Sequence, residues 1–593
     1  MPKLNKSKIL GFLLFLSCFF SYTWINSYFI SSRNVDYSKY YGYINYFTGI
    51  DVDIDYGQGV IYYFLIARRL LSKIDSVNFS NSEFVLNSAV HEINFLLFLI
   101  GLVGFFVFLK FKNYKTETIL ASLIFLVYFP QTIYLRAVMK PEILAFAFIP
   151  WVLLNIEKYI LDHKIQNLLF AIPFLSLIIN SKGSVAGMLI IYLIFSYFEI
   201  LKKITLKKFI IILISSLAVL GILQFENYTI TGNTLFERPY DSEYDFKADP
   251  KILINANIYE AIRFPFFKLN DVGITYHSDS VINPLLLDTF GDYFNQLFDS
   301  DDHYFLKNRK ELFVKNIENS FIESRQISYD GLLSDILIWR LDHVRKMVSF
   351  IFSIIFYLSI IFFGIKDKKN RKFFFAPFIG IIILYINSLG FPSNNFNPIK
   401  GDTFKSFYFS FLLSVAILFI GLKIFKKINY KTLLFLTLYV MSIFFISGHP
   451  KQNDQLFSEY LVVTNQYSPF CEINNYIIYE NDLLKFLFKS GNINNLKSDC
   501  DEKKLGTNKN RASYDNSYAV DCIGSKKEIL NNHGENRSLI PNSSECRIYA
   551  LEQVKENNSL IVPKVPFFSI SLLLYCIFYI LYEVRLTTQR LQD

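Results

Sequence analysis

The sequence predicts an all-α polytopic membrane protein with about 12 transmembrane helices, and three observations predict that class. First, 52% of the 593 residues are apolar and 18% are aromatic, and the mean hydropathy is +0.30. Membrane proteins reach such values routinely and soluble domains rarely. Second, apolar stretches of about 20 residues recur along the chain. Third, short lysine clusters separate these stretches, so the net charge of +9 indicates membrane orientation and not a nucleic-acid-binding groove.

Each predicted span is a mostly apolar segment about as long as a hydrocarbon core, which needs roughly 20 residues. The first span is interpreted as an uncleaved anchor, because no small-residue cleavage site follows it. The predicted spans are residues 8–30, 89–109, 118–135, 141–157, 166–181, 184–200, 208–226, 346–365, 373–391, 405–423, 431–448 and 565–583.

Lysine-rich connections predict the orientation. Four of them fall on one side when the spans are threaded in order: "KFKNYK" (110–115), "LKKITLKK" (201–208), "KDKKNRK" (366–372) and "KIFKKINYK" (423–431). The positive-inside rule makes that side the cytoplasm, and both termini fall there. The predicted organisation is an anchor (1–30), a first outer loop (31–88), helices two to seven (89–226), a large outer loop (227–345), helices eight to eleven (346–449), a cysteine-containing outer loop (450–564) and a last helix with its tail (565–593).

Cysteine placement singles out the last outer loop. Four of the six cysteines lie there: Cys471, Cys500, Cys522 and Cys546. An even set in an exported segment predicts two structural disulfides, with three possible connectivities. We therefore expect a small disulfide-containing domain of α/β or irregular structure.

The first outer loop concentrates carboxylates near the predicted membrane surface. The stretch "NVDYSKYYGYINYFTGIDVDIDYGQ" (34–58) carries Asp36, Asp51, Asp53 and Asp55. Short helices are predicted on both sides of the acidic turn, at 38–47 and at the amphipathic 60–74. For each aspartate, solvation of a loop is the ordinary interpretation. The alternative is a general base at the surface, with Asp36 the first choice and Asp55 the second.

Two further outer loops combine charges with helix starts. In "YLRAVMKPEIL" (134–144), Arg136, Lys140 and Glu142 lie between two spans, and Pro141 begins the second helix. Charged groups there are costly to desolvate and are often functional, although Glu142 would also gain from the helix dipole.

The other loop, "NPIKGDTFKSF" (397–407), carries Lys400, Asp402 and Lys405 ahead of a predicted helix. Backbone amides at a helix start, together with lysines, suit a phosphate group. A capped helix with snorkelling lysines is the alternative.

Motifs for other chemistries are missing from the sequence. It contains no CxxC, HExxH, P-loop or strand-following GxGxxG pattern, and its seven histidines have no metal-ligand spacing. We expect no metal and no cofactor.

Residues 8–425 resemble the polytopic GT-C glycosyltransferases. The resemblance rests on the anchor with its acidic outer loop, the "RAVMKPE" loop and the "GDTFKSFY" segment. It is closest to the bacterial relatives of the dolichyl-phosphate-mannose protein mannosyltransferases and of the lipid A aminoarabinose transferases. These families often show an Asp-Glu pair where this chain has Asp36-Tyr37, which leaves room for Asp51, Asp53 or Asp55. Of these, Asp55 is the second candidate, because it lies just before the second amphipathic helix.

The resemblance implies transfer of a sugar from a polyprenyl-phosphate donor to a lipid, glycan or protein acceptor. The reaction would occur on the outer face of a bacterial cytoplasmic membrane. Asp36, or Asp55, would be the general base and Glu142 a second carboxylate. The implied donor-phosphate contacts are Arg136, Lys140, Lys400 and Lys405.

Three alternatives stay open. A flippase for a lipid-linked sugar would share the spans but would place charges at mid-membrane. A polysaccharide polymerase or ligase would use arginine and histidine in a long outer loop, and residues 227–345 contain Arg325, Arg340, His343 and Arg345. A non-enzymatic envelope scaffold would fit the cysteine loop but not the polar groups clustered at helix mouths.

Overall fold

The computed structural model is predominantly helical in the part of the chain that it describes. That part comprises residues 6–28, 37–49, 54, 57–74, 82–202, 204–233, 285–286, 289–290, 329–389, 406–447, 476–480, 517–522, 536–540, 546–551 and 562–592. Within these ranges, seven helices are long and apolar enough to cross a membrane, or eight if one bent pair counts as a single span. The prediction of an α-helical membrane protein is confirmed at this level.

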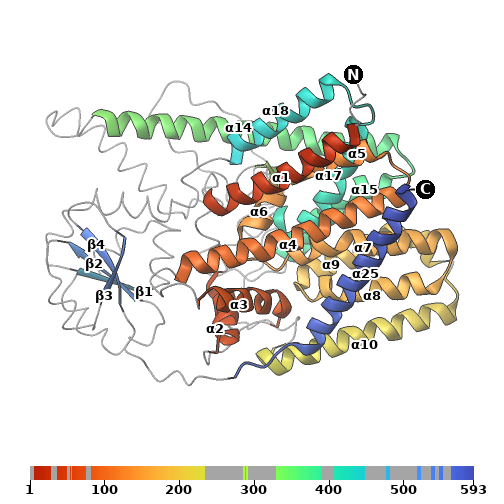
Figure 1. Cartoon of the computed structure of the whole chain (residues 1–593), viewed down its shortest axis with the longest axis horizontal. Coiled ribbons are helices and arrows are strands. Elements are labelled where there is room, and N and C mark those ends of the chain that lie inside the picture. Colours follow the sequence, from red (N-terminus) through yellow and green to blue (C-terminus); the bar gives the residue numbers. More distant parts are fainter. Residues whose placement is uncertain are drawn as a thin grey trace.

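The helices run in the same order as the predicted spans (Figure 1). Both short helices predicted in the first loop are present, as α2 and α3. The bounds are α1 Lys6–Tyr28, α2 Tyr37–Phe47, α3 Val60–Ile74, α4 Ser82–Phe111, α5 Thr116–Val127, α6 Pro130–Ala137, α7 Ile143–Asp162, α8 Ile165–Ile179, α9 Gly183–Leu201, α10 Leu206–Thr231, α14 Tyr329–Lys366, α15 Arg371–Phe374, α16 Ala376–Leu389, the 3-10 helix η5 Ser406–Phe409, α17 Ser410–Ile424, α18 Tyr430–Ser447 and α25 Phe567–Gln592.

Four of the predicted spans correspond to helices whose described apolar stretch is shorter than 18 residues: Ile165–Ile179, Gly183–Glu199, Ala376–Ile386 and Tyr430–Phe444. A fifth, predicted as one helix at 118–135, is instead the pair α5 and α6 with a bend of 58°. Pro130 causes this break, because the residue before a proline avoids the helical conformation, and Phe129 is extended with ψ 127°. The Thr132 hydroxyl donates to the carbonyl of Leu126 at 2.8 Å and so satisfies an acceptor that the break frees.

Helix α7 lies at the centre of the bundle. Most of α7 and of α17 is buried inside the structure, whereas hardly any of α10 is. Two glycines let α4 approach α7 closely: a Cβ at Gly101 would lie 2.5 Å from the Phe146 ring, and one at Gly104 would lie 2.6 Å from Pro150. Small residues serve the same purpose at helix crossings in membranes generally. This close packing therefore fixes the position of α7 along the axis of α4.

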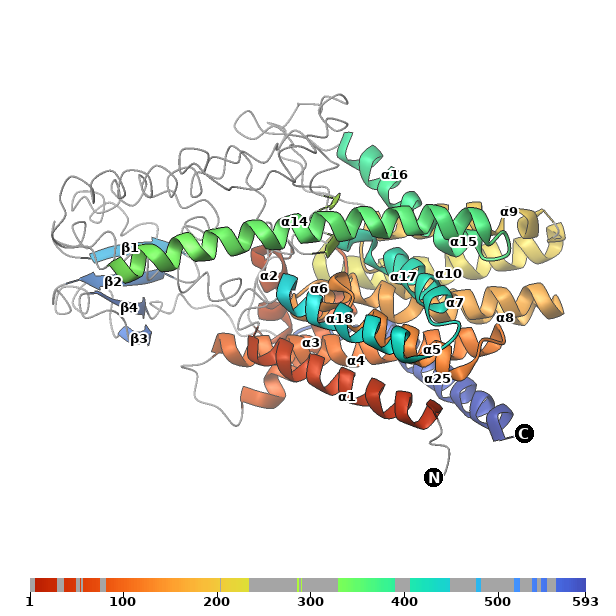
Figure 2. The ribbon, with the colours of Figure 1, turned by 90° about the horizontal axis from the view of Figure 1, so that it is seen from above.

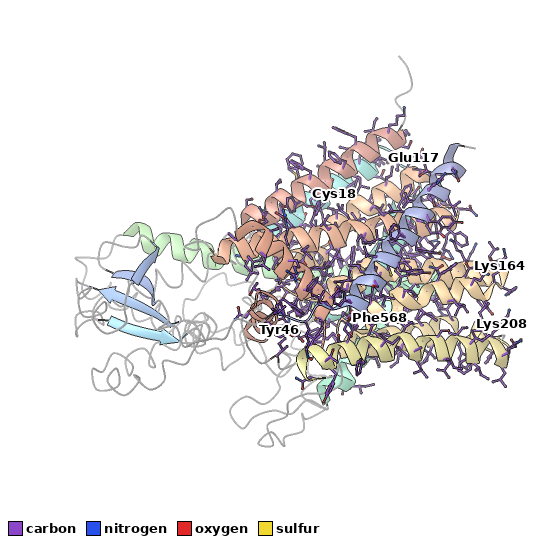
Figure 3. The ribbon with its side chains drawn as sticks, turned by 60° about the horizontal axis from the view of Figure 1, so that its bottom comes forward. Cys18, Tyr46, Glu117, Lys164, Lys208 and Phe568 are labelled. Atoms are coloured by element: carbon purple, nitrogen blue, oxygen red, sulfur yellow. The ribbon has the colours of Figure 1, made fainter. Side chains whose placement is uncertain are left out.

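The bundle has two distinct ends (Figure 1). At one, which we call the terminal end, lie both chain termini, and Figure 3 shows Glu117, Lys164 and Lys208 there. The opposite end, which we call the loop end, carries α2 and α3, with Tyr46 labelled in Figure 3. Helix α14 has 38 residues, roughly 57 Å of helix at 1.5 Å per residue. Figure 2 shows it running past its neighbours at the loop end.

A mostly buried carboxylate, 11% exposed, joins several helices near the terminal end. Glu157 of α7 accepts from Lys112 at 3.0 Å, from Lys372 at 2.6 Å and from the Tyr197 hydroxyl at 3.2 Å. These partners come from the end of α4, from α15 and from α9. Lysines of two predicted inner clusters are therefore paired with one carboxylate.

The described strands of residues 450–564 form one antiparallel sheet in the order β1-β2-β4-β3 (Figure 1). They are β1 Tyr476–Glu480, β2 Ser517–Cys522, β3 Asn536–Ile540 and β4 Cys546–Leu551. The register places Cys522 directly opposite Cys546. Cys471 and Cys500 lie outside the described residues.

Among the three connectivities that the sequence leaves open, this register favours a disulfide between Cys522 and Cys546. Directly opposed residues of an antiparallel pair have Cα atoms about 4.5–5.5 Å apart, within the span that a disulfide bridges. Peptide mapping by mass spectrometry without reduction should find the 522–546 cross-link, and the Cys522→Ser variant should lose it. A link from Cys471 to Cys522 or to Cys546 would contradict the observed register.

Candidate functional site

The connection between α6 and α7 is held rigidly at the loop end. Asn94 of α4 donates from Nδ2 to the carbonyls of Arg136 and Val138, at 3.1 and 2.8 Å. The Tyr62 hydroxyl donates to Asn94 Oδ1 at 2.8 Å and accepts from the Lys140 amide at 3.1 Å. Burial raises the pKa of Tyr62, so this hydroxyl stays protonated and keeps its donor. These contacts fix the backbone that carries Lys140 and Glu142.

His91 contributes to the same clamp. Its Nε2 lies 3.1 Å from the carbonyl of Ala137, so this nitrogen carries the proton and donates. Its unprotonated Nδ1 lies 3.3 Å from the side-chain amide of Asn26 on α1, whose NH2 group is the donor that this nitrogen requires. His91 is therefore a buried positioning group, which agrees with its lack of metal-ligand spacing.

A close backbone approach brings the start of α3 against this connection. Gly59 has φ +66°, and a Cβ built there would lie 2.7 Å from the Pro141 ring. Its amide donates to the carbonyl of Asn180 at 2.8 Å. Glycine is required here for two reasons. Other residues rarely adopt a positive φ, and any Cβ at this position would clash with the Pro141 ring. The α3 start, the α6–α7 connection and the α8–α9 turn thus meet at one place.

Glu142 lies at this meeting point, immediately before α7. Its side chain is 0% exposed, and Oε1 accepts from the Lys182 ammonium at 2.9 Å. Its other oxygen, Oε2, is buried and has no hydrogen-bond partner among the described residues. A buried carboxylate oxygen without a partner is costly and requires an explanation. It is the group best placed here to take a proton from a ligand.

Lys182 was not predicted from the sequence. It lies in the turn between α8 and α9, with its side chain 16% exposed and its ammonium 4.2 Å from the Tyr408 ring centre. The sequence contained one sign of it. Lys182 is a lone lysine between the predicted spans 166–181 and 184–200, on the predicted outer side, where lysine is less common than on the cytoplasmic side. Its partner lies 40 residues earlier in the chain, so local sequence could not reveal the pair.

Lys140 converges on the same ring. It is buried, with its ammonium 5.0 Å from the Phe407 ring centre and 5.9 Å from that of Tyr408. Two ammonium groups therefore lie around the η5 segment, and that of Lys182 donates to the Glu142 carboxylate. This arrangement of one carboxylate and two lysines is suited to binding an anion while a proton is transferred nearby.

Arg136 was predicted as a site residue together with Lys140 and Glu142, but its side chain has a structural role. Its guanidinium donates to the carbonyl of Thr132 at 2.9 Å, to the Ser21 hydroxyl at 2.6 Å and to the carbonyl of Val127 at 2.5 Å. It also stacks on Phe98 at 4.2 Å. These partners join α1, α4, α5 and α6, so this guanidinium holds the helix break together.

Several predicted site residues lie outside the described part of the chain: Asp36, Asp51, Asp53, Asp55, Lys400, Asp402 and Lys405. The backbone near Asp55 is nevertheless anchored. The carbonyl of Ile54 accepts from Asn233 at 2.9 Å, and that of Gly57 accepts from Asn227 at 2.8 Å. Ile54 and Gly57 are therefore fastened to the loop end of α10. In the described ranges, no three His, Cys, Asp or Glu side chains are grouped as a metal would require.

Fold and site together define an α-helical membrane protein with a buried carboxylate–lysine pair at the mouth of its central helix. Comparison with known proteins adds no narrower class. No family model, no curated protein and no solved structure matches the chain.

Proposed function

We propose that the chain is an integral membrane glycosyltransferase. It moves a sugar from a polyprenyl-phosphate donor to an acceptor on the outer face of a bacterial cytoplasmic membrane, in a GT-C-like bundle of about 12 spans. The single observation that carries the proposal is Glu142. It is fully buried at a helix mouth, one oxygen is paired with Lys182, and the other has no partner among the described residues.

The chemistry follows from these groups. An acceptor hydroxyl attacks the anomeric carbon of the donor, and the bond from that carbon to the phosphate oxygen breaks. Glu142 Oε2 takes the proton of the hydroxyl as general base. Lys140 and Lys182 stabilise the charge on the departing polyprenyl phosphate. Asp36 and Asp55 remain alternative bases from the resemblance.

The distribution of described charges supports surface chemistry over transport. Glu142 and Lys182 lie at the loop end of α7, and the Glu157 group lies near its terminal end. A flippase would place charges along the path between the two ends. The polymerase or ligase alternative depends on residues 227–345, most of which lie outside the described part.

The proposal predicts that Lys182 binds the donor phosphate. Purified full-length protein in nanodiscs should bind polyprenyl phosphate, and Lys182→Met should weaken binding by about 10- to 100-fold, the range for loss of a hydrogen bond to a charged group. Lys164→Met, at the terminal end (Figure 3), should bind as wild type does.

The double variant Glu142→Gln with Lys182→Met guards against misfolding, because it removes both charges of the buried pair. It should melt close to wild type and still bind polyprenyl phosphate weakly. Wild-type affinity in both Lys182 variants would contradict the phosphate role.

A further inference from the structure

Three amide side chains form a cluster beside the candidate site. Asn180, at the end of α8, accepts at Oδ1 from Gln224 Nε2 at 3.0 Å and from Asn227 Nδ2 at 2.6 Å. Both donors come from α10. Asn180 is 1% exposed and Asn227 is 0% exposed. We call Asn180, Gln224 and Asn227 the amide cluster.

The cluster leaves one donor and one acceptor unused. Asn180 Nδ2 and Asn227 Oδ1 are buried and have no hydrogen-bond partner among the described residues. Each such group costs about 1–3 kcal/mol when it stays unsatisfied. Two of them within one hydrogen-bonded pair indicate that something else satisfies them.

Reversed amide assignments do not remove these two groups. Asn227 Nδ2 also donates to the carbonyl of Gly57 at 2.8 Å, so exchanging its oxygen and nitrogen would set two oxygens against each other. Exchanging those of Asn180 would set its nitrogen against the Asn227 donor. Among the described residues, the donor and the acceptor therefore lack partners whichever way the two amides are assigned.

The chemistry of the cluster selects its ligand. A hydroxyl group both donates and accepts, so hydroxyl groups can satisfy Asn180 Nδ2 and Asn227 Oδ1 together. A phosphate or a carboxylate only accepts, and an ammonium only donates, so either would leave one of them unpaired and buried.

The cluster is continuous with the candidate site. The carbonyl of Asn180 binds the amide of Gly59, and Gly59 packs on Pro141, next to Glu142. Lys182 follows Asn180 by two residues. A sugar ring bound at the amides would therefore lie beside the carboxylate–lysine pair.

We propose that the amide cluster is a subsite for the hydroxyl groups of an uncharged sugar ring. This rests on the proposed glycosyltransferase function and narrows its donor to a neutral, hydroxyl-bearing sugar. Uronic acids and amino sugars are disfavoured, because the cluster has no charge with which to pair them.

The test compares ligands that share the lipid phosphate and differ in the sugar. Full-length protein in nanodiscs is titrated with polyprenyl phosphate, with a neutral polyprenyl-phosphate hexose and with the matching uronic acid. Wild type should bind the hexose form most tightly. Asn180→Leu should weaken hexose-donor binding about 10-fold, the effect of roughly 1.4 kcal/mol, and should leave binding of bare polyprenyl phosphate unchanged.

Two further variants make the result decisive. Asn180→Asp keeps the acceptor for Gln224 and Asn227 and removes the donor. It should therefore lower the ratio of the affinity for the hexose donor to the affinity for bare polyprenyl phosphate, even if Asn180→Leu folds poorly. Asn155→Leu is the matched control. This amide is equally buried on α7, but both its polar atoms are hydrogen-bonded, to the Trp151 carbonyl and the Tyr579 hydroxyl. Its variant should therefore leave that affinity ratio unchanged.

The outcomes separate the subsite from the function. Equal wild-type affinity for the hexose donor and bare polyprenyl phosphate overturns the subsite and leaves the phosphate site standing. Equal weakening of both ligands by Asn180→Leu overturns the subsite as well, since it reveals packing or a buried water only. Tighter binding of the uronic acid form overturns the neutral-sugar assignment. Wild-type protein that binds neither ligand overturns the proposed function itself.

Discussion

Glu142→Gln is expected to lower the rate of sugar transfer by roughly 10²–10⁴-fold, the contribution typical of a general base. Glutamine keeps the shape of the side chain and an oxygen for Lys182, but it cannot take up the acceptor proton. Polyprenyl-phosphate binding should therefore stay close to wild type, so the loss should appear in kcat. Initial rates with a neutral polyprenyl-phosphate sugar, together with binding titrations, check both halves of this expectation.

Glu157→Gln is the matched control for this experiment. Glu157 lies on the same helix and is likewise held by lysines, but it lies near the terminal end. Its variant should keep the wild-type transfer rate per folded molecule. If Glu142→Gln also keeps that rate while Asp36→Asn or Asp55→Asn loses it, the base lies in the first loop and Glu142 has a positioning role.

Arg136→Met is expected to destabilise the protein by about 3 kcal/mol, because it removes the hydrogen bonds that a buried charged group donates to three acceptors. The acceptors are the carbonyls of Val127 and Thr132 and the hydroxyl of Ser21. Reversible unfolding of the purified protein in mixed micelles measures the change. Arg136→Lys should rescue little, since an ammonium cannot reproduce the planar fork of the guanidinium.

Arg371→Met serves as the control, because Arg371 is exposed and stacks on Phe375. Its effect should stay within about 0.5 kcal/mol, as for most surface substitutions. A stable Arg136→Met protein with weakened polyprenyl-phosphate binding would overturn the structural role and restore the phosphate role that the resemblance implies.

Hydropathy was sufficient to predict the helices, because a span must satisfy its backbone within one continuous apolar segment. It did not predict the break between α5 and α6. The proline at position 130 is the only local sign of it, and many membrane helices tolerate a proline.

The site was predictable only where its residues are neighbours in the chain. Lys140 and Glu142 were found because a proline, a lysine and a carboxylate at a helix start form a local pattern. Lys182 and the amide cluster were not, since each contact joins segments about 40 residues or more apart. Arg136 belongs to the same local pattern as Lys140, but its side chain is directed to α1 and to the helix break.

The contacts of Arg136 also bear on how the protein is made. Ser21 on α1 and Phe98 on α4 both precede Arg136 in the chain, as do the two carbonyls that it binds. Chains are synthesised from the N-terminus, and a lone arginine is costly within a bilayer. These four partners have therefore left the ribosome before the arginine itself. The bent arrangement of α5 and α6 can therefore form as soon as α6 enters the membrane, before the second half of the protein is synthesised.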